Sequence, residues 1–198
     1  MKIIGLTGGI ASGKSTVSTY LRLKGIPVFD ADAKARESQA KGGACLGDIV
    51  KLLGPKALSA NGDMDRKWVS QQVFQHPEQL DALNALVHTY VTRERDKFIS
   101  QNSQEKLVVL DAPLLIECTW HKIADYVWLV AVDKETQIAR AMTRSSLSLG
   151  EVEARIAHQM SLEDKKAYAQ VVLENSGSKE ALFQQVDAAL NRLDRELR

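Results

Sequence analysis

The sequence lacks the features of several protein classes. Its 26 lysines and arginines nearly balance its 25 acidic residues, and a net charge of +1 predicts no nucleic-acid partner. No apolar run approaches the roughly 20 residues that span a bilayer, and no apolar segment of signal length precedes the first glycines, so no membrane partner is expected. The two cysteines have no CxxC spacing and are expected to be reduced, buried thiols in a cytoplasmic protein.

Short apolar runs alternate with helical patterns, and this alternation predicts an α/β fold. The runs are residues 1–7, 26–29, 107–110, 126–130 and 171–173. Strands separated by helices form a parallel sheet, here of five strands, with helices on both faces. Such sheets bind ligands at the carboxyl ends of their strands, and three of these ends are acidic (Asp30, Asp111 and Asp133). Metal and proton chemistry is therefore expected there.

Changes in apolar pattern and charge along the chain predict three structural parts, a core, an inserted domain and a lid. Residues 1–32, 104–144 and 167–198 form the nucleotide-binding core. Residues 33–103 carry helical patterns and are expected to form a helical domain that binds the acceptor. Residues 145–166 are charged and poor in apolar side chains, and are expected to form a mobile lid of two helices.

The stretch TGGIASGKST at positions 7–16 joins the first strand to a helix. Gly8, Gly13, Lys14 and Ser15 match the pattern G-x-x-x-x-G-K-S/T of the P-loop NTPase fold. Backbone N–H groups of such a loop hold phosphate oxygens, the lysine reaches the β- and γ-phosphates, and the hydroxyl ligates Mg²⁺. The residues expected to bind the nucleotide are Gly9, Ile10, Ala11, Ser12, Gly13, Lys14, Ser15 and Thr16.

The apolar run 107–110 ends in Asp111, as in a Walker B strand. The carboxylate of such a strand holds the Mg²⁺ shell, so Ser15 and Asp111 are the expected metal residues.

Other features of the sequence indicate which class of nucleotide-binding protein this is. It has neither the guanine-reading N-K-x-D pattern nor a D-x-x-G after Asp111. A chain of 198 residues with a helical insertion and a basic late segment suits a small-molecule kinase that uses ATP. A nucleotide-dependent switch without an acceptor is the alternative from another class.

A kinase needs a base for the acceptor hydroxyl and cations for the transferred phosphoryl group. Asp30 and Asp32 follow the second strand, and either is a candidate base. Otherwise both cap the following helix, with Asp32 as the N-cap. Arg140 and Arg144, four residues apart on one helix face, are expected to act from the lid, and Arg155 is a weaker candidate. His88 is either an acceptor ligand or a structural residue.

Together these motifs resemble the dephospho-CoA kinase family along the whole chain. The matching stretches are residues 4–15 (IGLTGGIASGKS), 30–36 (DADAKAR), 111–117 (DAPLLIE), 155–160 (RIAHQM) and 174–178 (ENSGS). The P-loop alone is generic, whereas the DADxxxR and DxPLLxE stretches together with NxG are specific.

The resemblance implies transfer of the ATP γ-phosphate to the 3′-hydroxyl of dephospho-CoA, with Mg²⁺. It implies that Asp32 is the general base and that Arg140 is the lid arginine near the phosphates. Arg36 would help to bind the acceptor, Asn175 would sit at the adenine, and Thr7 would lie beside the reacting phosphates. The family often has His-Pro where this chain has His88-Thr89, which leaves the placement of His88 open. A monomer or weak homo-oligomer is expected.

Overall fold

The computed structural model describes residues 1–145, 148–157 and 159–196. The chain divides into two compact units, Met1–Phe29 with Asn102–Arg198, and Asp30–Gln101. The boundary lies three residues earlier than the expected start of the helical domain at residue 33, so Asp30 and Asp32 belong to the second unit. Each unit has its own apolar core and is described by itself.

The first unit contains a five-stranded sheet in the order β2-β3-β1-β4-β5. The strands are β1 (Lys2–Gly8), β2 (Val28–Asp30), β3 (Leu107–Asp111), β4 (Tyr126–Ala131) and β5 (Val171–Glu174). The central strand β1 pairs in parallel with β3 and β4, and β4 pairs in parallel with β5. The predicted α/β fold with a five-stranded parallel sheet is therefore confirmed.

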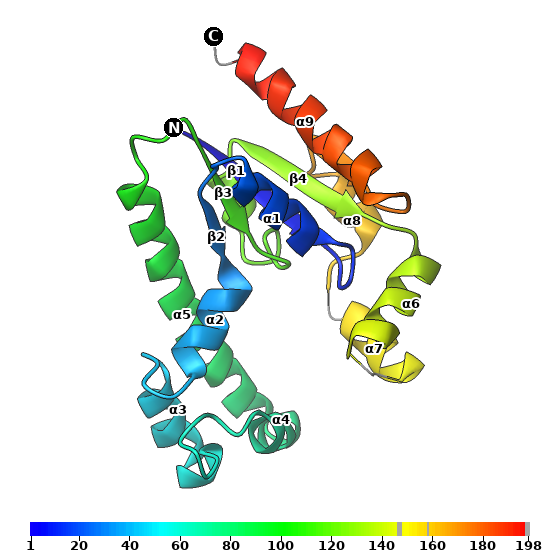
Figure 1. Ribbon diagram of the computed structural model, residues 1–198. Coiled ribbons are helices and arrows are strands. Elements are labelled where there is room, and N and C mark those ends of the chain that lie inside the picture. The colour runs from blue at the N-terminus through cyan, green and yellow to red at the C-terminus, as the bar shows by residue number, and fades with distance from the viewer. Residues whose placement is uncertain (146–147, 158, 197–198) are drawn as a thin grey trace. The chain divides into compact units, whose positions relative to one another are not determined.

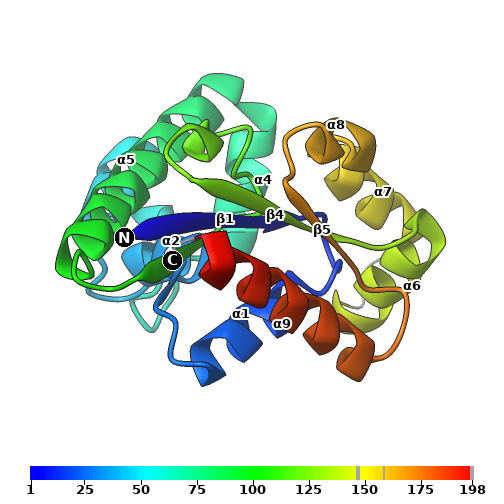
Figure 2. The same ribbon diagram turned by 90° about the horizontal axis from the view of Figure 1, so that it is seen from above.

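Helices cover both faces of this sheet (Figure 2). Helices α1 (Lys14–Leu23) and α9 (Lys179–Glu196) contact each other on one face, and α8 (Leu162–Lys166) contacts β4 on the other. The core beneath α1 and α9 consists of apolar side chains from these helices and from the strands, and includes Ile4, Leu6, Val17, Leu21, Val109, Val130, Leu182 and Val186. Burying the strands on both faces explains why they read as continuous apolar runs.

Helices α6 (Lys134–Ser145) and α7 (Leu149–Ala157) pack against each other, and η2 (Trp120–Lys122) is a short 3-10 turn. The expected lid, residues 145–166, contains α7 and α8, although residues 146, 147 and 158 of that range lie outside the described residues. Residues 197 and 198, at the end of the expected core, lie outside them too. Val152 and Lys165 are fully buried, so this charged stretch packs more closely than its composition suggests.

The second unit is helical and consists of α2 (Ala31–Gln39), α3 (Leu46–Leu53), η1 (Pro55–Ala57), α4 (Arg66–Gln75) and α5 (Pro77–Gln101). Helices α2 and α5 lie side by side (Figure 1). A second core is formed by Cys45, Ile49, Ala57, Val69 and Val73. Helix α4 has two buried residues, Val69 and Val73, and therefore contributes little apolar pattern to the sequence of this unit.

Both cysteines are unpaired thiols, Cys45 buried and Cys118 half-buried. Burial raises the pKa of the Cys118 thiol. Within the described ranges, no helix combines the length and the apolar character needed to cross a membrane.

Candidate active site

The predicted phosphate loop leaves β1 at Gly8 and enters α1 at Lys14. Gly13 precedes the helix with φ 95°, and Ala11 has φ 56°, so the loop contains two left-handed residues. The N-cap of α1 is Gly13, which has no side chain to bond the first N–H groups, and the first turn of this described helix has no acidic residue. The positive end of the helix is thus available to an anion.

Gly13 is packed so closely against Asn175 that a side chain at this position would displace it. The Asn175 side-chain amide donates a hydrogen bond of 2.7 Å to the Ser12 carbonyl oxygen. A Cβ on Gly13 would lie 2.0 Å from the nitrogen of that amide. Asn175, in the loop after β5, therefore holds the phosphate loop in place through its contacts with Ser12 and Gly13.

We expect Gly13→Ala to lower both the thermal stability and ATP binding. The added methyl group must displace Asn175 and also accept a left-handed backbone. Gly25→Ala is the matched control, because Gly25 is left-handed as well (φ 79°) but no described atom lies within 4 Å of an added Cβ. The control should lose only about 1 kcal/mol of stability, the cost of the left-handed conformation. Equal melting temperatures and equal ATP affinities for the two variants would contradict the packing role of Asn175.

Lys14 and Asp111 form an ion pair at the ends of α1 and β3. The Lys14 ammonium donates to one carboxylate oxygen of Asp111, and the Ser18 hydroxyl donates to the other. The pair is shielded from water, since the side chain of Asp111 is 2% exposed and that of Lys14 14% exposed. The side chain of Asp111 is therefore fixed in position next to the phosphate loop by Lys14 and Ser18.

The oxygen ligands of this region fit Mg²⁺. Among the described residues no group of three or more His, Cys, Asp or Glu side chains could hold a metal ion. Asp111 and the exposed Ser15 offer a carboxylate and a hydroxyl, and Mg²⁺ in kinases is held by one or two such groups together with substrate phosphates and water. A nucleotide would thus have to supply the remaining ligands.

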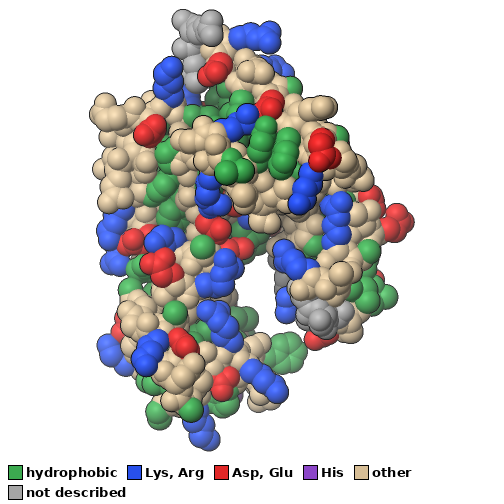
Figure 3. Space-filling view, in the orientation of Figure 1, with side chains coloured by type: hydrophobic (Ala, Val, Ile, Leu, Met, Phe, Trp, Pro, Cys, Tyr) green, Lys and Arg blue, Asp and Glu red, His purple; other side chains and the backbone are tan. Residues whose placement is uncertain are grey.

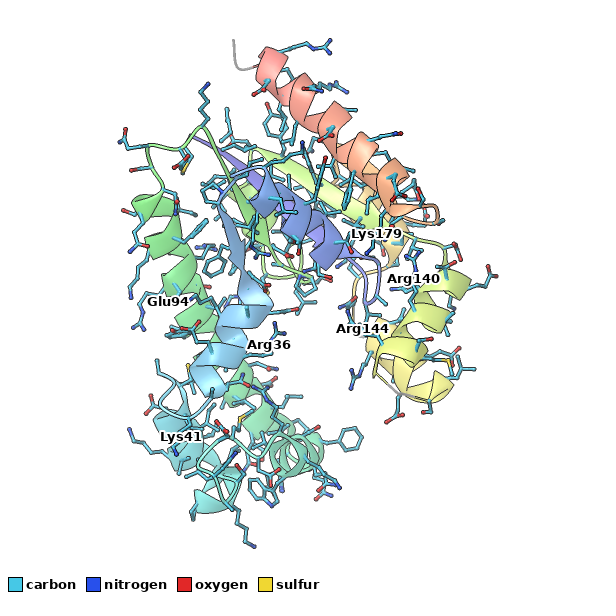
Figure 4. The ribbon with its side chains drawn as sticks, viewed as in Figure 1. Arg36, Lys41, Glu94, Arg140, Arg144 and Lys179 are labelled. Carbon is cyan, nitrogen blue, oxygen red and sulfur yellow. The ribbon has the colours of Figure 1, made fainter. Side chains whose placement is uncertain are left out.

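The predicted arginines meet the phosphate loop at an open depression of about 450 Å³. Its lining residues come from the loop, α1 and α6, and are Ala11, Gly13, Ser15, Thr16, Ala139, Arg140, Thr143 and Arg144. Arg140 and Arg144 project from the same side of α6 (Figure 4). Lys and Arg side chains also lie over α6 on the face shown in Figure 3. The depression therefore combines an open helix N-terminus with two cations.

Two further predicted residues of this unit lie differently. Thr7 is fully buried and its hydroxyl donates to the Pro113 carbonyl oxygen at 3.1 Å. Arg155 is exposed on α7 and is not among the residues that line the depression.

The second unit carries the acidic pair. Asp30 is the N-cap of α2, and its carboxylate accepts a hydrogen bond of 2.8 Å from the Ala33 N–H. The alternative prediction that Asp32 is the N-cap is therefore wrong, because α2 begins at Ala31, whereas an N-cap at Asp32 would require it to begin at Ala33. Asp32 is exposed in the first turn, and Arg36 is exposed four residues later on the same helix face.

His88 is exposed on α5, which runs unbroken from Pro77 to Gln101. Where the family often has proline after this histidine, the Thr89 hydroxyl donates to the Ala85 carbonyl oxygen at 2.8 Å. The helix therefore continues without a break through this position, where the chain has threonine and not proline.

Comparison with known proteins shows to which family the chain belongs. The family model described as dephospho-CoA kinase matches residues 2–181. The chain belongs to the dephospho-CoA kinase family. A protein of Streptococcus agalactiae serotype Ia named dephospho-CoA kinase is 42% identical over 196 residues, which cover 97% of this chain and 99% of that protein. The resemblance stated from the sequence is confirmed.

Solved structures share the fold of this chain. A crystal structure from Thermus thermophilus has a TM-score of 0.83 and 41% identity, and the match covers 97% of both chains. Dephospho-CoA kinase from Campylobacter jejuni has a TM-score of 0.74 at 23% identity over the full length of both chains, which shows the shared fold.

This kinase also has a buried lysine, paired with a more exposed glutamate, that the sequence did not reveal. Lys165 is 1% exposed, and its ammonium donates to the Pro113 carbonyl oxygen at 2.6 Å and to Glu117 at 3.1 Å. Burial lowers the pKa of Lys165, and the Glu117 carboxylate partly offsets this. Burial also raises the pKa of Glu117, but N–H bonds from its own backbone and from Met160, together with Lys165, bring it below its usual range. Lys165 lies in a run of charged residues that is typical of a solvated surface, so nothing in the neighbouring sequence indicates that it is buried.

Proposed function

We propose that this kinase transfers the γ-phosphoryl group of ATP to the 3′-hydroxyl of dephospho-CoA, giving coenzyme A and ADP. The observation that carries the proposal is the family match over residues 2–181, in a chain that keeps the phosphate loop and its buried Lys14–Asp111 pair. The site residues below are our assignments.

The donor half lies in the first unit. The backbone N–H groups of residues 11–16 hold the phosphate oxygens of ATP at the start of α1. Lys14 moves from Asp111 onto the β- and γ-phosphates. Arg140 and Arg144 line the same depression and offset the negative charge that spreads over the transferred group. Asn175 is assigned to the adenine end on resemblance, and its amide also keeps the loop in place.

We assign Mg²⁺ to Ser15 and Asp111. Bound with ATP, the ion would neutralise charge on the phosphates. The release of Asp111 by Lys14 would leave a carboxylate oxygen for the ion, while the Ser18 hydroxyl keeps the other oxygen in position.

The acceptor half lies in the second unit. Asp32 takes the proton of the 3′-hydroxyl onto a carboxylate oxygen as that hydroxyl attacks the γ-phosphorus. Asp30 is less suited to this role because it already accepts the N-cap bond, so it would position the acceptor. Arg36 shares a helix face with Asp32, and Arg36 and His88 complete the proposed acceptor contacts of this unit. Thr7, which is buried in the first unit, is assigned to the acceptor on resemblance alone.

ATP and dephospho-CoA are the expected partners, with no nucleic acid and no membrane. A monomeric or weakly associating state and a cytoplasmic location remain predictions from the sequence.

A panel of acceptors tests the proposal. ADP release is measured by a coupled assay with dephospho-CoA, a nucleoside and gluconate. We expect turnover with dephospho-CoA and little with the other two. Equal or higher turnover with the nucleoside or gluconate would favour a kinase of another small hydroxyl acceptor. ATP binding without any acceptor-dependent ADP release would favour a nucleotide-dependent switch.

A further inference from the structure

Both backbone groups of Ile10, in the first half of the phosphate loop, are taken by glutamine side chains. The Gln137 amide nitrogen, on α6, donates to the Ile10 carbonyl oxygen at 2.9 Å. The Gln159 amide oxygen, two residues beyond α7, accepts from the Ile10 N–H at 3.2 Å. The same Gln137 nitrogen would lie 2.5 Å from a Cβ on Gly9, so α6 is packed closely against the loop. Ile10 is thus held from two sides.

The next residue explains why such a hold matters. Ala11 has φ 56°, a conformation that is costly for a residue with a Cβ. Ala11 joins Ile10 to the residues that lead into α1, so a change in its conformation would redirect the N–H groups at the start of this helix. A strained residue keeps its conformation when its neighbours are fixed. Ile10 is fixed by the two glutamines, and Ser12 is fixed on the other side by Asn175.

Gln159 also belongs to an anchored segment. The N–H of the next residue, Met160, donates to the Glu117 carboxylate at 3.0 Å, and Glu117 pairs with the buried Lys165. The hydrogen bond to Ile10 therefore connects the phosphate loop to the segment that follows α7. A displacement of this segment would release the Ile10 N–H.

We propose that Gln137 and Gln159 are positioning residues for ATP binding. Together they hold Ile10 so that Ala11 stays left-handed and the following N–H groups stay directed at the phosphates. The inference rests on the proposed nucleotide site and adds two side chains that do not need to touch the nucleotide.

The test measures ATP binding by calorimetry with Mg²⁺ and without acceptor, and then KM for both substrates. In Gln137→Ala and in Gln159→Ala, an Ile10 backbone group loses its partner. We expect ATP affinity to fall by about tenfold in each, with KM for dephospho-CoA unchanged. Gln170→Ala is the matched control, because the Gln170 amide oxygen accepts from a backbone N–H too, that of Val127 at 2.6 Å, but at the start of β4, away from the phosphate loop at the other end of the strands. It should bind ATP like the unaltered protein.

A double-mutant cycle separates positioning from general destabilisation. Glycine accepts a left-handed backbone at little cost, so Gln137→Ala should weaken ATP binding much less in an Ala11→Gly background than in the unaltered background. Equal losses in the two backgrounds would overturn the inference, as would ATP affinities of the Gln137 and Gln159 variants equal to that of the control. If the unaltered protein binds no ATP, the proposed function itself fails, and that result is seen before any variant is compared.

Discussion

Replacing Lys14 by methionine is expected to reduce kcat/KM for phosphoryl transfer by at least about a thousandfold. Lys14 is the cation assigned to the β- and γ-phosphates, and it stands at the start of α1 with its side chain 14% exposed. Methionine keeps the length of the side chain and removes the charge. The coupled ADP-release assay gives kcat/KM, and a thermal melt shows whether the variant is folded.

Two variants control for the loss of charge and for stability. Lys24→Met removes a lysine from the other end of α1, where Lys24 pairs with Asp187, and should leave kcat/KM within about twofold. Lys14→Met leaves Asp111 without its cation, so Lys14→Met with Asp111→Asn should melt at a higher temperature than Lys14→Met alone and still be inactive. A Lys14→Met enzyme with near-normal turnover would refute the phosphate-binding role of the loop.

Replacing Asp32 by asparagine is expected to lower kcat by about a hundredfold to ten-thousandfold while the affinity for ATP stays the same. Asparagine has the shape of the carboxylate but cannot take the proton of the acceptor hydroxyl. Asp32 is exposed in the first turn of α2 and is not its N-cap, so the helix should remain intact. The measurements are kcat by ADP release and ATP affinity by calorimetry.

Asp48→Asn is the matched control in the same unit, since Asp48 lies in the first turn of α3. It pairs with Lys51 on the surface and should keep normal turnover. Asp30→Asn helps to divide the work of the acidic pair, because asparagine can still cap α2. If Asp30→Asn lost more turnover than Asp32→Asn, the base would be Asp30.

The parts of this molecule that were predictable depend on local pattern. The buried strands, α1 and α5 follow from apolar runs and helical spacing, and the phosphate loop follows from residue types that its conformation demands. Helix α4 was not predicted from the apolar pattern, because two buried residues, Val69 and Val73, make too short a pattern. The N-cap of α2 was placed at Asp32 instead of Asp30 because both residues are aspartates, which are equally good N-caps.

The supports of the site depend on which distant segments meet. Asn175 lies 163 positions from Ser12, and Gln137 lies 127 positions from Ile10. An amide side chain has the same composition whether it faces water or braces a loop. Lys165 was hidden in the same way, since its burial comes from the packing of α8 on the sheet and not from its neighbours in the sequence.

The central claim is that the γ-phosphoryl group of ATP is transferred to one hydroxyl of dephospho-CoA. Phosphorus NMR and mass spectrometry of the product, made with purified enzyme, ATP and Mg²⁺, test it directly. We expect one new phosphomonoester on the ribose 3′-oxygen, formed in equal amount to ADP. A phosphate at another position, or ADP formed without a phosphorylated acceptor, would contradict the account.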